Sequence, residues 1–592
     1  MRNQKMRRVI LRRRVQALDL SKQASRSIEK NLYSRVGHLV AVRRFVSVWL
    51  LFWLLLGLAS VWQIISLNHY FQTVQPVPGG IYNEGILGGL TNVNPIYATG
   101  EVDTSLSQLI FAGLLGYNSN NQLVDVLASG YSVDSAGTLY TVTLRPNLKW
   151  QDGQPLTAAD VVFTIDMIQN SNAQSPLFSS WQDISVSAPN PLTVQFKLPN
   201  PLASFPYNLT VGIIPKHLLG NVDPANLRSA SFNTNNPVGA GPFSWHALEV
   251  SGNTPQNAIE QIALLPFSHY VLGKPKLSEF IMHAYASQNQ LLAAFQSGQL
   301  NGLAGLNSVP NTIKTMPGVE VHSLILTAGS YVFFKTQGSI LSDSNIRKAL
   351  VMGSDPQAVI NKLGYQTYPV TEPLLQGQLA FNPKYAEATN QVAQAQALLN
   401  SDGWVLAKDG YRYKAGQQLS FNLVTTDTPE NRLVVGILAK QWRTLGVNLM
   451  PIFESPDTYA ISLADHNYDS TLDGISIGND PDVFVYWDKS QYDPRSSNLN
   501  LSEYDSNTAS IALEDARTRL DPALRVIKYE PFLAAWQKDA PALGLYQPRE
   551  IYITNGNVYG LGSAQINAQQ NRFNNVANWE ILTTGVTDPR QT

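Results

Sequence analysis

The segment from Tyr140 to Ile168 constrains the fold more than any other part of the chain, because it holds the signals for a strand, a turn and a capped helix in succession. In Tyr140–Leu144, apolar residues alternate with threonines, which is typical of a half-buried strand. Thr157 and Asp160 have the spacing of a capping box, whose hydroxyl and carboxylate satisfy free backbone N–H groups at a helix start. The apolar positions that follow, at intervals of four and three, are Val161, Ile165 and Ile168. The sequence therefore predicts a strand and an amphipathic helix that pack on one core.

Further successions of helix, glycine and strand predict α/β lobes along the chain. A helix over Gln290–Phe295 should end at Gly298, and a later helix should end at Gly446 before a strand at Val447–Met450. At 592 residues the chain is too long for one core, and two or three lobes are expected. Two irregular stretches with several Asn and Gln residues are predicted to be surface loops: 251–257 and 567–575.

An uncharged apolar run extends from Phe45 to Leu67. Its 23 residues, at about 1.5 Å rise each, can cross a hydrocarbon core of about 30 Å. Thirteen Lys or Arg residues but only two acidic ones precede it. This charge bias predicts a single-pass membrane anchor at 45–67, with segment 1–44 in the cytoplasm and the rest of the chain outside. The Pro- and Gly-rich segment 68–79 is predicted to be a linker.

Two other interpretations of the N-terminal region remain open. Small residues at Leu58–Ser60 could form the cleavage site of a signal peptide, although such peptides usually have a shorter charged region and a shorter apolar run. The basic segment could contact anionic lipid or nucleic acid, although a topology signal beside a membrane span accounts for its charge. An uncleaved anchor without nucleic-acid binding is the favoured hypothesis.

Composition excludes several chemistries. The chain has no Cys, so it has no disulfide, thiolate nucleophile, Cys-based zinc site or lipid-modified Cys. Its histidines are scattered, and no Gly-rich loop leads into a Lys-Ser or Lys-Thr pair. We therefore predict no metal site, no phosphate-binding loop and no cofactor.

The string LRPNLKWQDGQPLTAADVVFTI at Leu144–Ile165 resembles the signature of the family 5 extracellular solute-binding proteins of ABC importers, the oligopeptide- and dipeptide-binding group. Other segments resemble the same family in the same order: Asn236–Phe243, Phe295–Gly298, Asp343–Leu350, Ala397–Trp404, Asp480–Asp482 and Pro541–Tyr546. The resemblance covers nearly everything after residue 80.

The resemblance implies an α/β, type II periplasmic-binding-protein fold with two lobes and an extra subdomain, preceded here by one transmembrane helix. The implied boundaries are 80–117, 241–335 and 545–592 for lobe I, 118–240 for its subdomain and 336–544 for lobe II. It also implies a ligand site between the lobes. The matching positions are Glu101, Val102, Asp103, Gly474, Ile475, Ser476, Asp480 and Tyr546.

Each of these positions has a second interpretation. The acids at the start of the helix near residue 101 could stabilise its dipole, and Tyr546 could be a core aromatic. Trp404 and Trp442 are expected in the core, whereas Trp487 could stack on ligand. At Gly474–Ser476, backbone groups would bind the main chain of a ligand, which suits peptides with varied side chains. Lys335 replaces an asparagine common in the family, which puts a hinge or ligand contact there in doubt.

Ile477 is the main departure from the family. Typical relatives have an aspartate there, which neutralises the α-ammonium group of a bound peptide. A buried cation beside isoleucine would be strongly disfavoured. Either Asp480 or another acid takes over this role, or the ligand has no free amino terminus.

The string Gly474–Gly478 matches the G-x-S-x-G motif of serine hydrolases, with Ser476 as nucleophile. That motif needs a helix directly after the serine, whereas Asn479–Asp482 has the sequence of a turn. A hydrolase is therefore the third hypothesis. The first is a monomeric binding protein, not an enzyme, that passes peptides or peptide-like solutes to ABC permease subunits. The second is an interaction or signalling ectodomain that has kept the fold.

Overall fold

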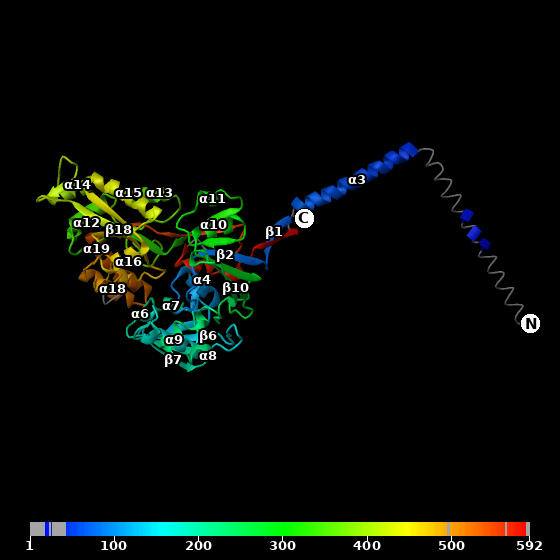
Figure 1. Ribbon diagram of the computed structural model, residues 1–592, viewed down its shortest axis with the longest axis horizontal. Coiled ribbons are helices and arrows are strands. Elements are labelled where there is room, and N and C mark those ends of the chain that lie inside the picture. The colour runs from blue at the N-terminus through cyan, green and yellow to red at the C-terminus, as the bar shows by residue number, and fades with distance from the viewer. Residues whose placement is uncertain are drawn as a thin grey trace, which may run out of the picture. The chain divides into compact units, whose positions relative to one another are not determined.

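The structure is a computed structural model that describes residues 18–19, 21–22, 25–26, 43–70, 72–493, 498–562 and 565–587 (Figure 1). Most of segment 1–44, predicted to be cytoplasmic, lies outside these residues. The chain divides into two compact units, one of residues 1–75 with 583–592 and one of residues 76–582. Each is described separately.

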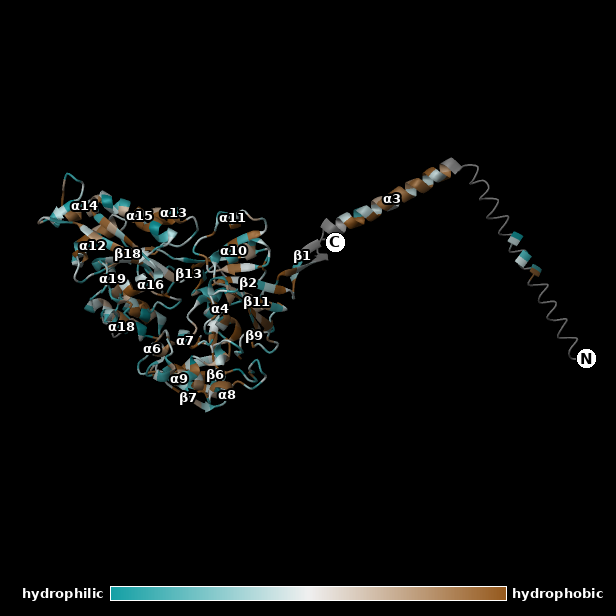
Figure 2. Ribbon diagram, viewed as in Figure 1, coloured by the Kyte–Doolittle hydropathy of each residue, from teal (hydrophilic) through white to brown (hydrophobic). Residues whose placement is uncertain are grey.

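The first unit contains helix α3 (Arg43–Tyr70). Within it, Phe45–Ser66 has a mean hydropathy of 2.1, and no part of this stretch is buried. Among the described residues, it is the one helix that is long and apolar enough to cross a membrane, and most of it is brown in Figure 2. Strand β1 (Gln72–Val77) occupies part of the predicted linker and pairs with β24 (Leu582–Thr587).

The second unit begins with an eight-stranded sheet, which we call the first lobe. The strand order is β23-β13-β22-β12-β2-β11-β10-β9. In chain order the strands are β2 (Ile81–Leu87), β9 (Phe243–Ser251), β10 (Ile259–Pro266), β11 (Glu279–Tyr285), β12 (Gly302–Ala304), β13 (Val319–Leu326), β22 (Arg549–Asn555) and β23 (Gln565–Ile566). The helices of this part are α4 (Glu101–Ile110), α10 (Gln288–Gln296) and α11 (Asn311–Lys314). The predicted end of α10 is confirmed, because Gly298 follows it with a φ of 79°.

A four-stranded sheet forms the subdomain, with order β5-β6-β8-β7. Its strands are β5 (Ala128–Val133), β6 (Leu139–Leu144), β7 (Ser185–Asn190) and β8 (Thr193–Lys197). The predicted strand is β6, and the predicted helix is α5 (Ala158–Gln169), which has the expected capping box at Thr157 and Asp160. Short elements complete this part: β3 (Leu115–Tyr117), β4 (Leu123–Asp125), α6 (Phe178–Trp181), α7 (Phe205–Asn208), α8 (Lys216–Leu219) and α9 (Pro224–Leu227). One hydrophobic core is continuous between the subdomain and the first lobe.

The second lobe is built on a five-stranded sheet with order β19-β18-β20-β14-β21. Its strands are β14 (Ala328–Phe334), β18 (Ser420–Thr426), β19 (Asn448–Glu454), β20 (Ser470–Ser476) and β21 (Ala542–Tyr546). A small hairpin sheet adds β15 (Val405–Leu406), β16 (Arg412–Lys414) and β17 (Gln417–Gln418). The helices, green to orange in Figure 1, are α12 (Ser344–Met352), α13 (Pro356–Leu363), α14 (Val392–Ser401), α15 (Pro429–Thr444), α16 (Pro456–Ala464), α17 (Phe484–Trp487), α18 (Asn507–Arg517) and α19 (Pro522–Asp539).

The second lobe has a separate core on each face of its sheet, because side chains alternate along a strand. Along β14, Val332 and Phe334 join one core, whereas Tyr331 and Phe333 join the other. The tryptophans of this lobe are core residues: Trp404 and Trp442 lie in the core that contains Val332, and Trp487 and Trp536 lie in the core that contains Tyr331. This confirms the prediction for Trp404 and Trp442.

The chain passes between the two large sheets at two adjacent places. Thr327 connects β13 to β14, and Gln547–Pro548 connects β21 to β22. The two connections are hydrogen-bonded to each other: Leu326 N donates to Pro548 O at 2.9 Å, and Gln547 Nε2 donates to Leu326 O at 3.3 Å.

One of the two predicted surface loops is wrong. Residues 251–257 are exposed, as expected. In 567–575, however, residues Gln569–Phe573 form a 3-10 helix, and Arg572 and Phe573 are 4% and 1% exposed. The physical reason is that Arg572 pairs with the buried Glu84 of β2, a partner distant in sequence. The Asn571 side chain closes a tight turn here, because it accepts from the Ala568 N–H and donates to Asn574.

Candidate ligand cleft

A cavity of about 450 Å³ lies between parts of both lobes and the subdomain. Helix α4 and segment 111–117 form one wall, and segments 207–212 and 567–577 form others. Ser476, at the end of β20, is the second lobe's contribution. We call this space the main cleft.

Every side chain described on the wall of the main cleft is uncharged at neutral pH. Amides, hydroxyls and apolar groups line it, but no Asp, Glu, Lys, Arg or His does so within the described part of the chain. Burial raises the pKa of both Tyr117 and Tyr270 to about 12 and also raises that of Tyr207. These hydroxyls are therefore neutral hydrogen-bonding groups at physiological pH. Such a cleft suits a ligand with many amide or hydroxyl groups.

A second cavity of about 370 Å³ lies along β20, and we call it the β20 pocket. Asp473, Gly474, Ile475 and Ser476 form one side of it. Ser476 therefore lines both cavities. Three of the predicted ligand residues, Gly474, Ile475 and Ser476, lie on the wall of the β20 pocket.

One edge of β20 is open along this pocket. On its other edge, β20 pairs with β14 over its full length, from Ser470 to Ser476. On the open edge, β18 pairs only with Ser470 and Thr471. After Thr471, side-chain hydroxyls donate to two main-chain carbonyls on this edge. Leu472 O accepts from Thr425 and Tyr459, and Ser476 O accepts from Tyr486.

The main chain of Gly474 faces the same edge as that of Leu472 and Ser476, because N–H and C=O directions alternate along a strand. The Gly474 N–H donates to the Asp473 carboxylate. A Cβ atom built at Gly474 would come no closer than 3.9 Å to any neighbour, so the fold would accept a side chain here. The glycine leaves this edge uncovered.

Asp480 lies in a buried ion pair. Its carboxylate accepts from Arg525 Nη1 at 2.7 Å and from Nη2 at 2.5 Å. Its neighbour Asp482 accepts from Ser204 at 2.8 Å and from Arg517 at 3.1 Å. The acids of this turn thus hold it against α18, α19 and the subdomain. Asp480 lines neither cavity, and its assignment as a ligand residue stays a prediction.

The predicted residues on α4 face away from the main cleft. Val102 and Asp103 are 2% and 1% exposed, and Asp103 accepts from the backbone N–H of Thr91 at 2.8 Å. Burial raises the pKa of Glu101, although Arg572 opposes this shift. The next turns of the helix do line the cleft, through Thr104, Ser107 and Gln108. Their spacing of three and four residues could have identified them in the sequence, because it places three polar side chains on one face of the helix.

Tyr546 is a buried residue of the second lobe, 2% exposed. Its hydroxyl donates to Glu430 Oε1 at 2.8 Å, and Tyr365 donates to the same oxygen at 3.1 Å. The Arg549 guanidinium lies 3.7 Å from the centre of the Tyr365 ring. Tyr546 therefore belongs to a polar cluster beside the Gln547–Pro548 connection, and its role as a ligand residue stays a prediction.

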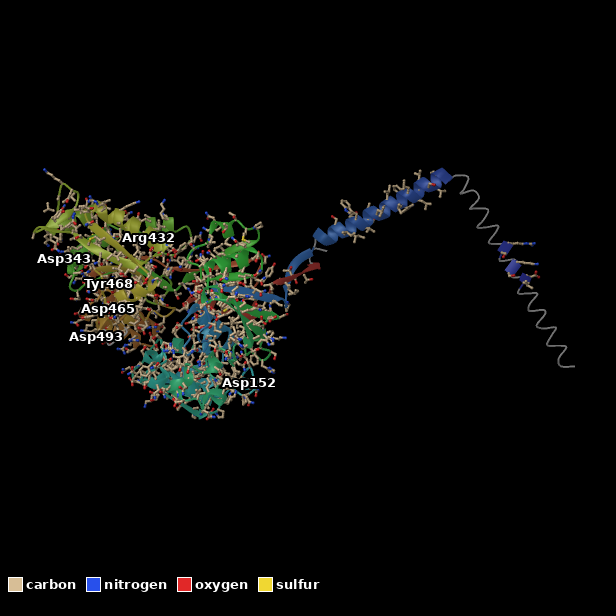
Figure 3. The ribbon with its side chains drawn as sticks, in the orientation of Figure 1. Asp152, Asp343, Arg432, Asp465, Tyr468 and Asp493 are labelled. Atoms are coloured by element: carbon tan, nitrogen blue, oxygen red, sulfur yellow. The ribbon has the colours of Figure 1, made fainter. Side chains whose placement is uncertain are left out.

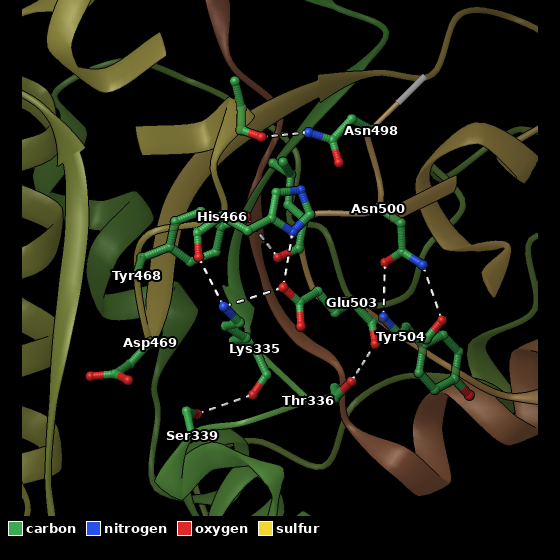
Figure 4. Close-up of polar contacts among 12 residues, drawn as sticks. Lys335, Thr336, Ser339, His466, Tyr468, Asp469, Asn498, Asn500, Glu503 and Tyr504 are labelled. Atoms are coloured by element: carbon green, nitrogen blue, oxygen red, sulfur yellow. Dashed lines mark hydrogen bonds and ion pairs between the residues drawn. The ribbon is translucent and has the colours of Figure 1, made fainter. Parts of the chain in front are cut away.

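Lys335 lies in a largely buried polar cluster outside both cavities (Figure 4). Its Nζ donates to His466 O at 2.9 Å and lies 3.2 Å from Glu503 Oε1, which is also 3.2 Å from His466 Nδ1. Burial would raise the pKa of Glu503, but the hydrogen bonds from His466 and Lys335, with the Lys335 charge, bring it below its usual value. Lys335 thus connects the end of β14 to the turns that contain His466 and Glu503.

A chain of amides bridges the two lobes and the subdomain, and we call it the asparagine bridge. Asn121 Nδ2 donates to Asn479 at 3.3 Å and to Asn567 at 3.0 Å, and Asn479 donates to the Asn121 carbonyl. Thr327, at one interlobe connection, donates to Asn567 at 2.5 Å. Its carbonyl accepts from Ile477 N at 3.0 Å and from Gly478 N at 2.9 Å.

We expect Asn479→Ala to favour an open arrangement of the lobes, because it removes two hydrogen bonds of this bridge, each with a net value of about 1 kcal/mol. The chain has no Cys, so spin labels can be placed at Glu249→Cys and Lys440→Cys, both exposed. Pulsed electron spin resonance should then show longer label distances than in the parent protein. Asn467→Ala, at an exposed position, is the control. Identical distance distributions in all three proteins would contradict the prediction.

Solved structures of other proteins share this architecture. NikZ from Campylobacter jejuni, in complex with Ni(L-His), matches with a TM-score of 0.71 at 24% identity, over 84% of this chain and 99% of NikZ. The oligopeptide-binding protein AppA from Bacillus subtilis, in complex with a nonapeptide, matches with a TM-score of 0.68 at 22% identity, over 86% of this chain and 100% of AppA. The chain therefore has the type II periplasmic-binding-protein fold, and the predicted fold class is confirmed.

The sequence comparisons are more specific. The family model for the bacterial extracellular solute-binding proteins, family 5 (middle part), matches residues 122–495. This chain belongs to that family. It is also 24% identical to AppA of Bacillus subtilis (strain 168) over 489 residues, which are 80% of this chain and 87% of AppA. The family consists of solute-binding proteins of ABC transporters, which supports a binding role and not an enzymatic one.

Proposed function

We propose that this chain is the membrane-anchored binding protein of an ABC importer and captures peptides or peptide-like solutes between its lobes. The open edge of β20 is the observation that carries this proposal, because it presents main-chain groups at Gly474 to a cavity. Main-chain groups suit ligands whose side chains vary. The uncharged polar wall of the main cleft supplies further hydrogen-bonding partners for amide groups.

In this proposal, α3 anchors a monomer in the cell membrane. The thirteen basic residues that precede the apolar run would keep the N-terminus in the cytoplasm, and the second unit would face outward. Ligand would bind when the lobes are apart and then favour the arrangement in which Ser476 meets the wall formed by α4. The closed form would be delivered to permease subunits.

The serine-hydrolase hypothesis has no geometric support. Ser476 lines both cavities without a histidine on either wall in the described residues. Two histidines of the folded part have other acidic partners: His217 contacts Asp152, and His466 contacts Glu503. Unchanged ester hydrolysis in Ser476→Ala would dismiss that serine.

The direct test is calorimetry of the full-length chain in detergent with a pool of random pentapeptides, together with mass spectrometry of compounds that copurify. Saturable heat of binding or a copurified peptide supports the proposal. If no peptide and no other small solute is retained, the proposal fails, and the interaction-ectodomain hypothesis gains.

We expect Gly474→Trp to weaken binding of the peptide pool by at least about tenfold, which corresponds to about 1.4 kcal/mol. A large side chain at Gly474 would cover the open edge of β20, while its Cβ would fit without a clash. Gly474→Ala should bind as the parent does. The matched control is Gly436→Trp on α15, an exposed position where a Cβ atom would meet no neighbour within 4 Å. Equal affinity of Gly474→Trp and the parent would remove β20 from the binding site.

A further inference from the structure

The β20 pocket has apolar walls and one charged side chain. Its walls come from α16, from Ile475 and Tyr486, and from residues 498–501. Asp473 is the single Asp, Glu, Lys, Arg or His among the described residues that line it. With the uncharged main cleft, this makes Asp473 the one charge at either cavity wall in the described part of the chain.

Asp473 has no positively charged partner among the described residues. No salt bridge and no side-chain hydrogen bond to it occurs there, and its one hydrogen bond comes from the Gly474 N–H. The titratable groups around it are tyrosines: Tyr459 on α16, Tyr468, Tyr486 on α17 and, across the sheet, Tyr331. All four are neutral at physiological pH, because burial raises their pKa values.

An anion in such a place is costly. Burial raises the pKa of Asp473 to about 6, despite the opposing Gly474 hydrogen bond. The same carboxylate would be stabilised by a cation that entered the pocket, because opposite charges at close range favour the ionised form. Perturbed carboxylates that lie in a cavity without a partner from their own protein are candidates for ligand contacts.

We propose that the ligand carries one basic group on an apolar stem, which enters the β20 pocket and pairs with Asp473, while the part in the main cleft is uncharged. This inference rests on the proposed function and specifies its substrate class. The apolar walls match the methylene stem of a lysine- or arginine-like group, whose charged end reaches the carboxylate. An acidic group in the same pocket would face an unpaired like charge and would be excluded.

The test uses three pools of N-acetylated, C-amidated pentapeptides of Ala, Gln and Tyr. One pool carries a single Lys at any position, the second carries norleucine instead and the third carries Glu. Binding to the full-length chain in detergent is measured by calorimetry at pH 7.5. We expect the Lys pool to bind at least about tenfold more tightly than the norleucine pool, and the Glu pool to bind most weakly.

Asp473→Asn should remove the preference for Lys, so that the variant binds the Lys pool and the norleucine pool with equal affinity. The matched control is Asp465→Asn, at an exposed position in the same lobe (labelled in Figure 3). A second readout needs no variant. Lowering the pH from 7.5 to 5 protonates a carboxyl whose pKa is about 6, so the Lys pool should lose affinity while the norleucine pool does not.

The outcomes separate the two proposals. If the parent protein binds peptides but does not distinguish Lys from norleucine, or if Asp473→Asn keeps the preference, this inference is overturned and the proposed function stands. If none of the three pools binds to the parent protein, this inference is overturned, while the proposed function is decided separately by the random pentapeptide pool and the copurified compounds.

Discussion

Arg572→Met should destabilise the second unit by about 3 to 5 kcal/mol, the usual cost of removing one partner of a buried ion pair. The Arg572 side chain is 1% exposed, and its Nε donates to Glu84 Oε1 at 3.1 Å. The same guanidinium donates to Ser105 at 3.1 Å and to Gln569 O at 3.0 Å. Without it, Glu84 would remain 0% exposed with only Tyr552 as donor, at 2.8 Å.

The effect should be large because Arg572 also compensates two other acids. Glu101 and Glu550 both interact with its charge, and burial raises the pKa of Glu550 to about 7. Each has a buried oxygen that accepts no hydrogen bond from the described residues. Removal of the guanidinium would leave three carboxyl groups together, which would either become protonated or repel one another.

Denaturant-induced unfolding at pH 7.5 measures this effect. The matched control is Arg432→Met, because Arg432 makes a closer pair with Asp427, at 2.5 Å, but at an exposed site, with side chains 55% and 47% exposed. Such a surface pair contributes about 0 to 1 kcal/mol. Adding Glu84→Gln to Arg572→Met should recover part of the stability, since the uncompensated charge is gone. A loss below about 1 kcal/mol in Arg572→Met would show that the pair is not buried as described.

This ion pair also explains why one part of the fold was not predicted from the sequence. Helices and strands follow from local patterns, so the capping box at Thr157 and the glycine at Gly298 gave element ends that the structure confirms. Arg572 and Glu84 are 488 positions apart, and nothing local indicates that they meet. A stretch of Asn, Gln and Arg therefore had the pattern of a surface loop.

The candidate site also combines features that the sequence predicted with features that depend on distant contacts. The residues Gly474–Ser476 were found from a motif, and the structure places them on a cavity wall. That the edge of β20 is open could not be predicted, because it depends on where β18 stops pairing with β20. The resemblance to the family pointed to Glu101, Val102 and Asp103 at the start of α4, yet the α4 residues at the main cleft are uncharged ones of the following turns.

Glu372→Gln should make the protein more stable than the parent at pH 8 but not at pH 5. Glu372 is 0% exposed, and the backbone N–H of Asn382 is its hydrogen-bond donor. Burial raises its pKa from 4.5 to about 8, against the effect of that hydrogen bond. Glutamine is uncharged at both pH values and keeps the acceptor for Asn382.

The direction of this pH effect on stability follows from the protons bound in the folded and unfolded states. Between pH 4.5 and 8 the folded state keeps the Glu372 proton and the unfolded state releases it, so the parent loses stability as pH rises, by up to about 1.4 kcal/mol per pH unit. The variant lacks this loss, and its advantage should approach about 5 kcal/mol at pH 8. Unfolding by denaturant at pH 5, 6.5 and 8 measures the gap, with Glu514→Gln on the exposed side of α18 as a control that should run parallel to the parent. An offset between Glu372→Gln and the parent that stays constant over this range would mean that Glu372 is already ionised in the folded protein.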